Sequence, residues 1–325
     1  MRLFDHLDKA AQLEPDAIAV VHADTAMTFA ELADLSHRIA VALYAQSLDP
    51  GSKVATLLPN HPLFFACQMG IHRTHHVWLP LNARATFSEN MDLLRDFGAQ
   101  WLFIHTDWVD ALVQQRETLP SLKGVVVVGG SAGPVDLVRL DDWMAPSGVR
   151  VPDLDVAPDT PVTLMSTGGS TGKSKGVLRT NLAWSTMIAN YRSALPYAER
   201  PVNLVVAPLS HAGGDVALGV LAQGGTQVIL PKADPGLILQ AIEAHRATTL
   251  FLPPTVVYAL LSHPDRHRYD YSSLRYLMYG AAPMSVQKLQ EAIDLFGPVL
   301  TQLYGLTEAT STVSIMSPRE HLLAL

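Results

Sequence analysis

Residues 161–181 read PVTLMSTGGSTGKSKGVLRTN, and this stretch decides how the rest of the chain is interpreted. Its apolar start, Val162 to Met165, is led by a β-branched residue and predicts a short buried strand. The residues that follow, 167–175, hold glycines, hydroxyl side chains and two lysines. Glycines let backbone N–H groups converge on an anion, while Ser, Thr and Lys add donors and positive charge. The stretch therefore predicts a phosphate-binding loop.

Two other motifs fit part of this loop. The P-loop pattern G-x-x-x-x-G-K-[ST] matches at Gly172-Lys173-Ser174, but Thr167 stands where the pattern begins with glycine. The hydrolase elbow G-x-S-x-G matches around Ser170, which would be its nucleophile. An elbow leads directly into a helix, however, and Lys173-Ser174-Lys175-Gly176 is a poor helix start. Its oxyanion tract should lie upstream, whereas the similar His211-Ala212-Gly213-Gly214 lies downstream. Both motifs stay open as alternatives, beside a plain flexible Gly/Ser loop.

Composition limits the class of protein. The chain has 325 residues, of which 48% are hydrophobic, so a large core is expected. A net charge of −7 argues against nucleic-acid and anionic-membrane partners. The single cysteine, Cys67, fits a reducing compartment, and its apolar surroundings predict buried packing. No secretory h-region and no apolar run of membrane-spanning length is present in the sequence, so we expect a soluble, cytoplasmic protein.

Short apolar runs alternate with amphipathic segments along the chain, which predicts βαβ units and an α/β fold with mostly parallel sheets. The expected strands are 53–58, 77–81, 101–105, 125–128, 162–166, 203–207, 226–230, 248–252, 274–279 and 299–303. The expected helices are 24–48, 62–73, 86–98, 215–223, 235–246 and 285–296.

Small or polar residues follow four of these strands. Besides the glycine loop, they are the segments 208–214, 280–283 and 304–308, the last reading YGLTE. Ligands of open α/β sheets bind at the carboxyl ends of the strands, so these segments are the candidate site.

Together these residues resemble the adenylate-forming acyl-activating superfamily, which includes acyl- and aryl-CoA synthetases, luciferases and peptide-synthetase adenylation domains. Thr167–Gly176 matches the superfamily loop [ST]-[SG]-G-[ST]-T-G-x-P-K-G except at Ser174, and YGLTE follows in the expected order. The resemblance implies two stacked, mostly parallel sheets with helices on both faces. It also implies AMP-forming activation of a carboxylic acid by Mg·ATP, then transfer of the acyl group to a thiol, usually coenzyme A.

The resemblance implies a role for each matching residue. The loop residues expected to bind the β- and γ-phosphates are Thr167, Gly168, Gly169, Ser170, Thr171, Gly172 and Lys175. The residues expected around the adenine are Gly280, Ala281, Ala282, Pro283, Tyr304 and Gly305. Thr307 is expected to bond the α-phosphate, Glu308 to ligate Mg²⁺, and His211 to line the tunnel for the carboxylate.

Superfamily members continue beyond the YGLTE motif with a ribose-binding aspartate, a hinge and a mobile C-terminal domain that carries a catalytic lysine. We therefore expect residues 1–325 to be an incomplete N-terminal adenylating domain. Its expected subdomains are 60–185 for a first sheet, and 10–59 plus 186–315 for a second. A non-catalytic nucleotide- or acyl-binding protein of the same fold stays open as an alternative to an acyl-CoA ligase.

The expected substrate is a fatty or aryl acid rather than an amino acid. Peptide-synthetase domains place an aspartate directly after the position of His211, and here Ala212 follows, with Asp215 further on. The oligomeric state stays open, a homodimer included. The spacing of His72, His75 and His76 places them on one helical face, but no carboxylate or cysteine joins them locally, so we expect no metal there.

Overall fold

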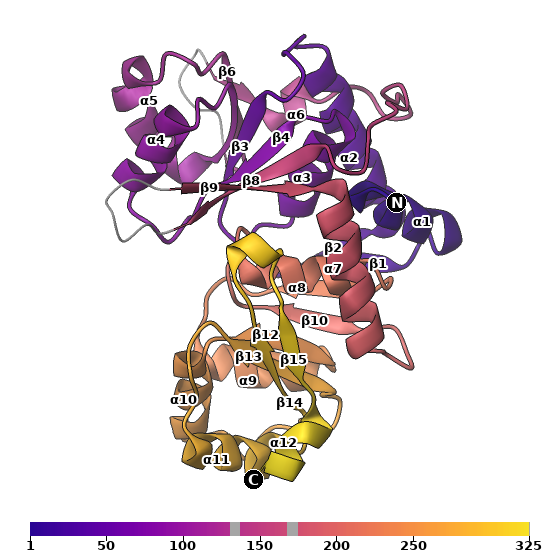
Figure 1. The fold of residues 1–325 in the computed structure, drawn as a ribbon, viewed down its shortest axis with the longest axis vertical. Coiled ribbons are helices and arrows are strands. Elements are labelled where there is room, and N and C mark those ends of the chain that lie inside the picture. The colour runs from indigo at the N-terminus through magenta and orange to yellow at the C-terminus, as the bar shows by residue number, and fades with distance from the viewer. Residues whose placement is uncertain (131–136, 168–174, 325) are drawn as a thin grey trace. The chain divides into compact units, whose positions relative to one another are not determined.

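The computed structural model describes residues 1–130, 137–167 and 175–324. The chain divides into two units, one made of residues 1–16 and 29–185, the other of residues 17–28 and 186–325. Each unit contains one mostly parallel sheet with helices packed on it (Figure 1). The predicted α/β class with two such sheets is confirmed.

The described strands of the first unit form a sheet in the order β7-β6-β5-β3-β4-β8-β9. All are parallel except β9, which pairs antiparallel with β8. Their bounds are β3 (Lys53–Leu57), β4 (Val77–Pro80), β5 (Trp101–His105), β6 (Gly124–Val128), β7 (Val138–Arg139), β8 (Pro161–Thr167) and β9 (Lys175–Thr180). The helices are α1 (Leu3–Leu13), α2 (Phe29–Tyr44), α3 (Phe64–Arg73), α4 (Phe87–Asp96), α5 (Val109–Gln115) and α6 (Leu140–Trp143), with α7 (Asn181–Ala194) reaching into the second unit.

Helices α4 and α5 close a buried core on the first sheet. Met91 and Leu94 of α4 and Leu112 of α5 pack with side chains of β3, β5 and β6. The start of α4 is a capping box, for which Thr86 and Glu89 have the required three-residue spacing in the sequence: Glu89 N–H donates to Thr86 Oγ1 at 3.2 Å, and Thr86 N–H donates to the Glu89 carboxylate at 2.8 Å. These bonds satisfy backbone donors that a helix start leaves unpaired.

The described strands of the second unit form a sheet in the order β15-β14-β13-β12-β10-β11-β1-β2. The two outermost pairs, β14–β15 and β1–β2, are antiparallel and the others parallel. The strand bounds are β1 (Ile18–His22), β2 (Thr25–Thr28), β10 (Val202–Val205), β11 (Thr226–Ile229), β12 (Thr249–Leu252), β13 (Tyr276–Gly280), β14 (Leu300–Tyr304) and β15 (Ser314–Met316). The helices are α8 (Ala212–Leu221), α9 (Pro235–Ala244), α10 (Pro254–Ser262), α11 (Val286–Phe296) and α12 (Pro318–Ala324).

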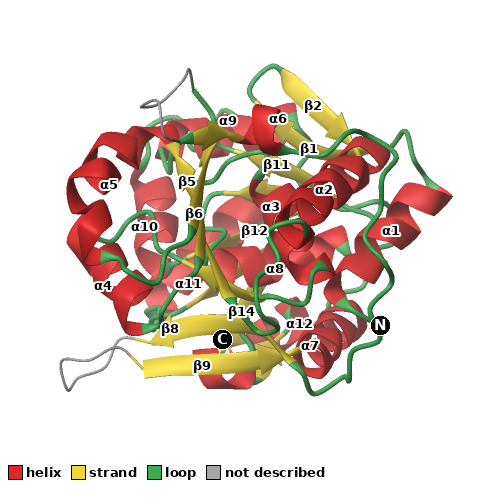
Figure 2. Cartoon of the chain, turned by 90° about the horizontal axis from the view of Figure 1, so that it is seen from above, coloured by secondary structure: helices red, strands yellow, loops and turns green. Residues whose placement is uncertain are grey.

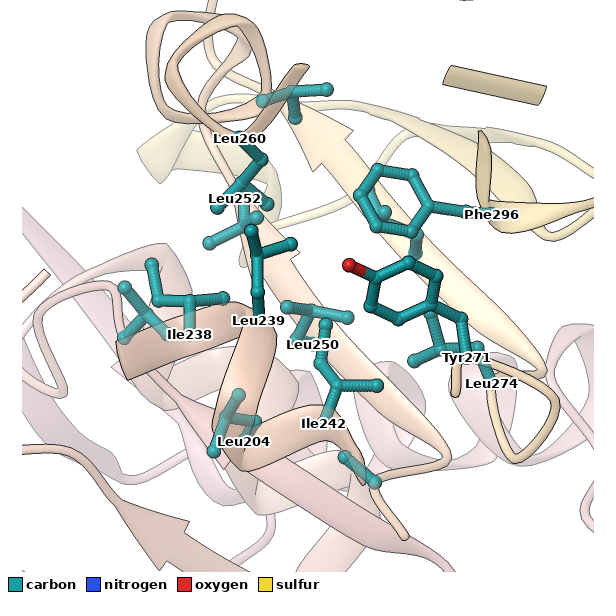
Figure 3. Close-up of a cluster of buried hydrophobic side chains, with 14 of the residues drawn as sticks. Leu204, Ile238, Leu239, Ile242, Leu250, Leu252, Leu260, Tyr271, Leu274 and Phe296 are labelled. Carbon is teal, nitrogen blue, oxygen red and sulfur yellow. The ribbon is translucent and has the colours of Figure 1, made fainter. Parts of the chain in front are cut away.

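One face of this second sheet is covered by α9, α10 and α11. Leu239, Leu260 and Phe296 from these helices pack with Leu204 and Leu250 of the sheet, all nearly inaccessible to solvent (Figure 3). Because strand side chains alternate between faces, Val205 and Phe251 point the other way, where they line a small cavity with residues of α8. Helices on both faces account for the parallel strands.

The structure corrects three expectations from the sequence. Residues 10–59 do not belong together with the second sheet: β1 and β2 do, while β3 pairs with β4 and β5 in the first. In the segment 24–48 the helix begins at Phe29, directly after Thr28, which has capping-box spacing to Glu31, but residues 25–28 form a strand paired with β1 and the helix ends at Tyr44. His72, His75 and His76 do not share a helical face, since α3 ends at Arg73 and His75 follows with a positive φ of 56°.

His72 is buried with neither ring nitrogen hydrogen-bonded within the described part of the chain. Its ring packs against Trp78, with 6.0 Å between the ring centroids. Burial, with a smaller contribution from His75, lowers the pKa of His72 to about 3 from its usual 6.5. The pKa of His76 falls in the same way to about 4. These histidines are neutral in the folded protein and take up protons on unfolding.

We predict that the free energy of unfolding falls as the pH drops from about 6.5 towards 3–4. Over this window the unfolded state binds more protons, and each such histidine adds up to about 1.4 kcal/mol per pH unit to the slope. His72→Leu should make the loss less steep in urea unfolding followed by circular dichroism. The exposed His267 serves as the control, as His267→Gln. The same slope in parent and His72→Leu would contradict the prediction.

Candidate active site

The sequence-predicted segments 208–214, 280–283 and 304–308 meet at one edge of the second sheet. They follow β10, β13 and β14, and these strands are parallel members of the run β14-β13-β12-β10. Parallel strands end at the same edge, and with about 4.8 Å between neighbours the three exits lie within about 14 Å along it. Strands β11 and β12 lie on opposite sides of β10, so the edge includes a topological switch point, where ligands of such sheets bind.

The exit of β10 leads directly into α8 with His211 at the N-cap. The Ser210 hydroxyl lies 2.9 Å from His211 Nδ1, and Ser210 is buried while His211 is partly accessible. The two glycines after His211 are required by close packing: a Cβ on Gly214 would lie 1.8 Å from the carbonyl oxygen of Leu209. The tight turn before α8 therefore explains the two glycines of His211-Ala212-Gly213-Gly214, the tract that is similar to an oxyanion motif.

The exit of β13 presents backbone to solvent. Gly280 is buried against β14, and a Cβ there would lie 2.4 Å from the carbonyl oxygen of Leu303. Ala281 has a positive φ of 65°, and residues 281–283 are exposed. This arrangement leaves an accessible surface of small residues on which a flat ring can lie.

A buried pair that the sequence did not indicate supports this exit. The Tyr279 hydroxyl donates to His321 Nε2 at 2.9 Å, and His321 Nδ1 contacts the Ser317 carbonyl oxygen at 2.8 Å. Burial raises the pKa of Tyr279 to about 12, so its hydroxyl is neutral and can act as the donor. The pair joins α12 to β13.

The exit of β14 is a turn that returns as β15. Tyr304 is 63% exposed at the end of the strand, and Thr307 and Glu308 lie on a short 3₁₀ turn, Thr307–Ala309. The Glu308 side chain is exposed. Thr310 and Ser311 follow with positive φ of 50° and 83°, which non-glycine residues adopt at a cost of about 1–3 kcal/mol each. Backbone strain of this kind is typical of binding and catalytic turns.

The glycine loop of the first unit joins two antiparallel strands. Thr167 ends β8 and Lys175 begins β9; the two residues are register partners, and the Thr167 hydroxyl donates to the Lys175 carbonyl oxygen at 3.3 Å. Both residues are accessible. Gly168, Gly169, Ser170, Thr171 and Gly172 lie outside the described residues.

The hairpin decides between the motifs that compete for this loop. A P-loop and a hydrolase elbow each pass from a strand into a helix, whereas this loop passes from a strand into a strand. The hairpin is also held firmly at its other end, where Trp184 Nε1–H donates to Thr163 Oγ1 at 3.0 Å. The topology therefore disagrees with both strand-to-helix alternatives, Ser170 as an elbow nucleophile included.

The donors at these exits suit a nucleotide with magnesium. Among the described residues no group of three His, Cys, Asp or Glu side chains is placed to hold a metal ion. Mg²⁺ does not need such a group, because it commonly keeps several waters and binds one or two carboxylates together with substrate phosphates. The exposed Glu308 carboxylate, next to the Thr307 hydroxyl, fits this pattern.

Comparisons with known proteins identify the family of the chain. The model of the family described as "AMP-binding enzyme" matches residues 7–323. The feruloyl-CoA synthase of an Amycolatopsis species is 36% identical over 318 residues, which are 97% of this chain and 61% of the synthase. The medium/long-chain-fatty-acid–CoA ligase FadD8 of Mycobacterium tuberculosis is 32% identical, over 92% of this chain and 53% of the ligase. The chain thus spans less than two thirds of the length of these relatives.

Among solved structures, the amide bond synthetase McbA from Marinactinospora thermotolerans is similar with a TM-score of 0.89 and 27% identity, over 99% of this chain and 63% of the synthetase. Within residues 1–130, 137–167 and 175–324, no helix combines the length and apolar character that crossing a bilayer requires. The family match covers nearly the whole chain, and the chain belongs to the AMP-binding enzyme family.

Proposed function

We propose that this protein activates a carboxylic acid with ATP and passes the acyl group to coenzyme A. The carboxylate attacks the α-phosphorus, the bond from that phosphorus to the bridging oxygen breaks, and pyrophosphate leaves. The thiolate of coenzyme A then attacks the acyl carbon of the acyl-adenylate and releases AMP. The observation that carries the proposal is the meeting of His211, the exposed 281–283 surface and the Thr307–Glu308 turn at one edge of the second sheet.

Different residues at this edge would bind the adenine, the α-phosphate and the carboxylate. The adenine would lie against the backbone of Gly280 to Pro283, with the exposed ring of Tyr304 beside it. The Thr307 hydroxyl would donate to the α-phosphate, where negative charge develops during the attack. His211, three strand positions away at the N-cap of α8, would face the incoming carboxylate.

In the first unit, the β8–β9 hairpin would bind the β- and γ-phosphates. Its two described ends, Thr167 and Lys175, are accessible, and the ladder fixes where they stand. The residue that follows the loop, Lys175, begins a strand, and its side chain would add positive charge to the anion site. When bound at Glu308, Mg²⁺ would neutralise charge on the departing pyrophosphate.

For the acid, we propose an aryl or fatty carboxylate. The names of the relatives support both classes: the feruloyl-CoA synthase acts on an aryl acid and FadD8 on medium- and long-chain fatty acids, as their names state. An indoleacetate–CoA ligase of Aromatoleum aromaticum, 31% identical over 98% of this chain, adds a second aryl acid.

The first prediction of the proposal is carboxylate-dependent exchange of labelled pyrophosphate into ATP. A panel of ferulate, 4-coumarate, indoleacetate, octanoate and palmitate should yield exchange with at least one acid. Coenzyme A should then convert that acid to its thioester, detected by mass spectrometry. Binding of Mg·ATP with no exchange for any acid would favour the non-catalytic nucleotide-binding alternative.

Glu308→Gln should slow pyrophosphate exchange about 100-fold, since an enzyme that loses one stabiliser of developing charge typically loses about this much. The melting temperature should stay unchanged because the side chain is exposed. Higher Mg²⁺ concentrations should be needed for half-maximal rate. Glu291→Gln is the matched control, as Glu291 pairs with Lys288 on α11. Equal exchange rates in the two variants would exclude Glu308 from the reaction.

Lys175→Ala should raise the Kd for Mg·ATP about tenfold, the loss expected for one hydrogen bond to a charged group. Lys173→Ala should have the smaller effect. A P-loop phosphotransferase would give the opposite ranking, because its motif lysine corresponds to Lys173. Isothermal titration of the two variants with Mg·ATP, beside Lys232→Ala as an exposed control, measures the ranking.

A further inference from the structure

We propose that Tyr191 is a positioning residue for the reaction. Its hydroxyl holds the turn of residues 307–312, defined here as the catalytic turn, in the conformation that presents Thr307 and Glu308. The inference rests on the proposed function for the roles of these two residues, and on hydrogen bonds, burial and backbone geometry for the action of Tyr191.

The hydroxyl of Tyr191 reaches the catalytic turn from a different part of the chain. It lies 3.0 Å from Thr312 Oγ1 and 3.4 Å from Ser311 Oγ, and these two hydroxyls are 3.3 Å apart. The three hydroxyls form a small cluster that joins α7 to the turn, across 120 residues of sequence. Each hydroxyl can both donate and accept, so all three can be paired at once.

The ring of Tyr191 is fixed independently of this cluster. Tyr191 is 2% exposed, and its ring packs on Gly219 of α8, where a Cβ would lie 3.2 Å from the Tyr191 Cδ1 and Cγ atoms. A glycine at position 219 thus lets the ring come close to the helix backbone. The ring is attached to α7 and packs against α8, and these two helices together fix the position of the hydroxyl.

The catalytic turn needs such support. Its base is held by the sheet, where Tyr304 pairs with Ser314 and Val313 N–H donates to the Tyr304 carbonyl oxygen at 2.8 Å. Inside the loop, Gly305 passes so close to Ser311 that a Cβ would lie 1.5 Å from the Ser311 carbonyl oxygen. Two successive non-glycine residues, Thr310 and Ser311, have positive φ. Strained conformations of this kind persist where surrounding contacts over-determine them.

These observations separate the base of the turn from its far side. Backbone bonds between β14 and β15 hold the base, while the Tyr191 hydroxyl holds residues 311 and 312, directly after the 3₁₀ turn with Thr307 and Glu308. Loss of the hydroxyl should leave the sheet intact and release the turn. The expected consequence is weaker binding of Mg·ATP, with the affinity for the carboxylic acid unchanged.

The test compares Tyr191→Phe with Tyr276→Phe in the full chain. Both remove one hydroxyl from the second unit; that of Tyr276 donates to the Pro196 carbonyl oxygen at 2.9 Å, away from the catalytic turn. Hydrogen exchange followed by mass spectrometry reports on peptides covering residues 305–313 without any need for activity. Calorimetry with Mg·ATP, and KM and kcat for each substrate, report on the site.

For Tyr191→Phe we expect faster exchange in residues 305–313, with other peptides unchanged, and a Kd for Mg·ATP raised about fivefold, as for one lost neutral hydrogen bond. KM for the acid should not move. Thr312→Val should reproduce the effect, Thr312→Ser should restore binding, and Tyr191→Phe with Thr312→Val should add little to either alone.

Unchanged exchange in residues 305–313, or faster exchange with an unaltered Kd for Mg·ATP, would overturn the inference. Equal effects of Tyr191→Phe and Tyr276→Phe would do the same. If the parent chain binds no Mg·ATP, the proposed function fails, and the exchange rates still decide whether Tyr191 holds the turn.

Discussion

Parallel pairing of β10, β12, β13 and β14 is the constraint on which the candidate site depends. Three of these strands, β10, β13 and β14, carry a candidate segment at the carboxyl end, and the segments after β10 and β13 lie more than 60 residues apart in sequence. Parallel strands end at the same edge, so backbone hydrogen bonding brings together residues that are far apart in the sequence. The leucine-rich core beneath the sheet supports this pairing (Figure 3).

The glycine loop, the other candidate segment, is connected to its flanking elements differently from the common phosphate-binding motifs. In motifs that pass from strand to helix, the helix N-terminus contributes aligned backbone dipoles to anion binding. Here the loop connects β8 to β9, drawn as neighbouring strands in Figure 2. Ladder hydrogen bonds hold the two ends of the loop, and strand β9 starts with the lysine itself. The described ends of this loop are therefore register partners in a strand pair.

Much of this arrangement could be predicted from the sequence. The strand over 101–105 and the capping box at Thr86 are found where the local pattern places them, because both depend on neighbouring residues. The β1–β2 hairpin was missed because β1 is held in its sheet by β11, two hundred residues away. The exposed strand β9 was missed because exposed residues leave no hydrophobic alternation to detect. No local signal links Tyr191 to Thr312, because the two residues lie 121 positions apart in sequence, although motif residues such as Thr307 could be named directly.

The glycines at the strand exits also bear on which positions of the candidate site can accept a side chain. At Gly214, Gly280 and Gly305 the space for a Cβ is already filled by a backbone carbonyl oxygen, at 1.8, 2.4 and 1.5 Å. Repacking of side chains cannot relieve an overlap with backbone, so these positions cannot be used to reshape the site. Substitutions that probe the candidate site should therefore leave the three glycines fixed and vary the side chains around them. At these three places the backbone sets the shape of the candidate site, and only the side chains around them are open to change.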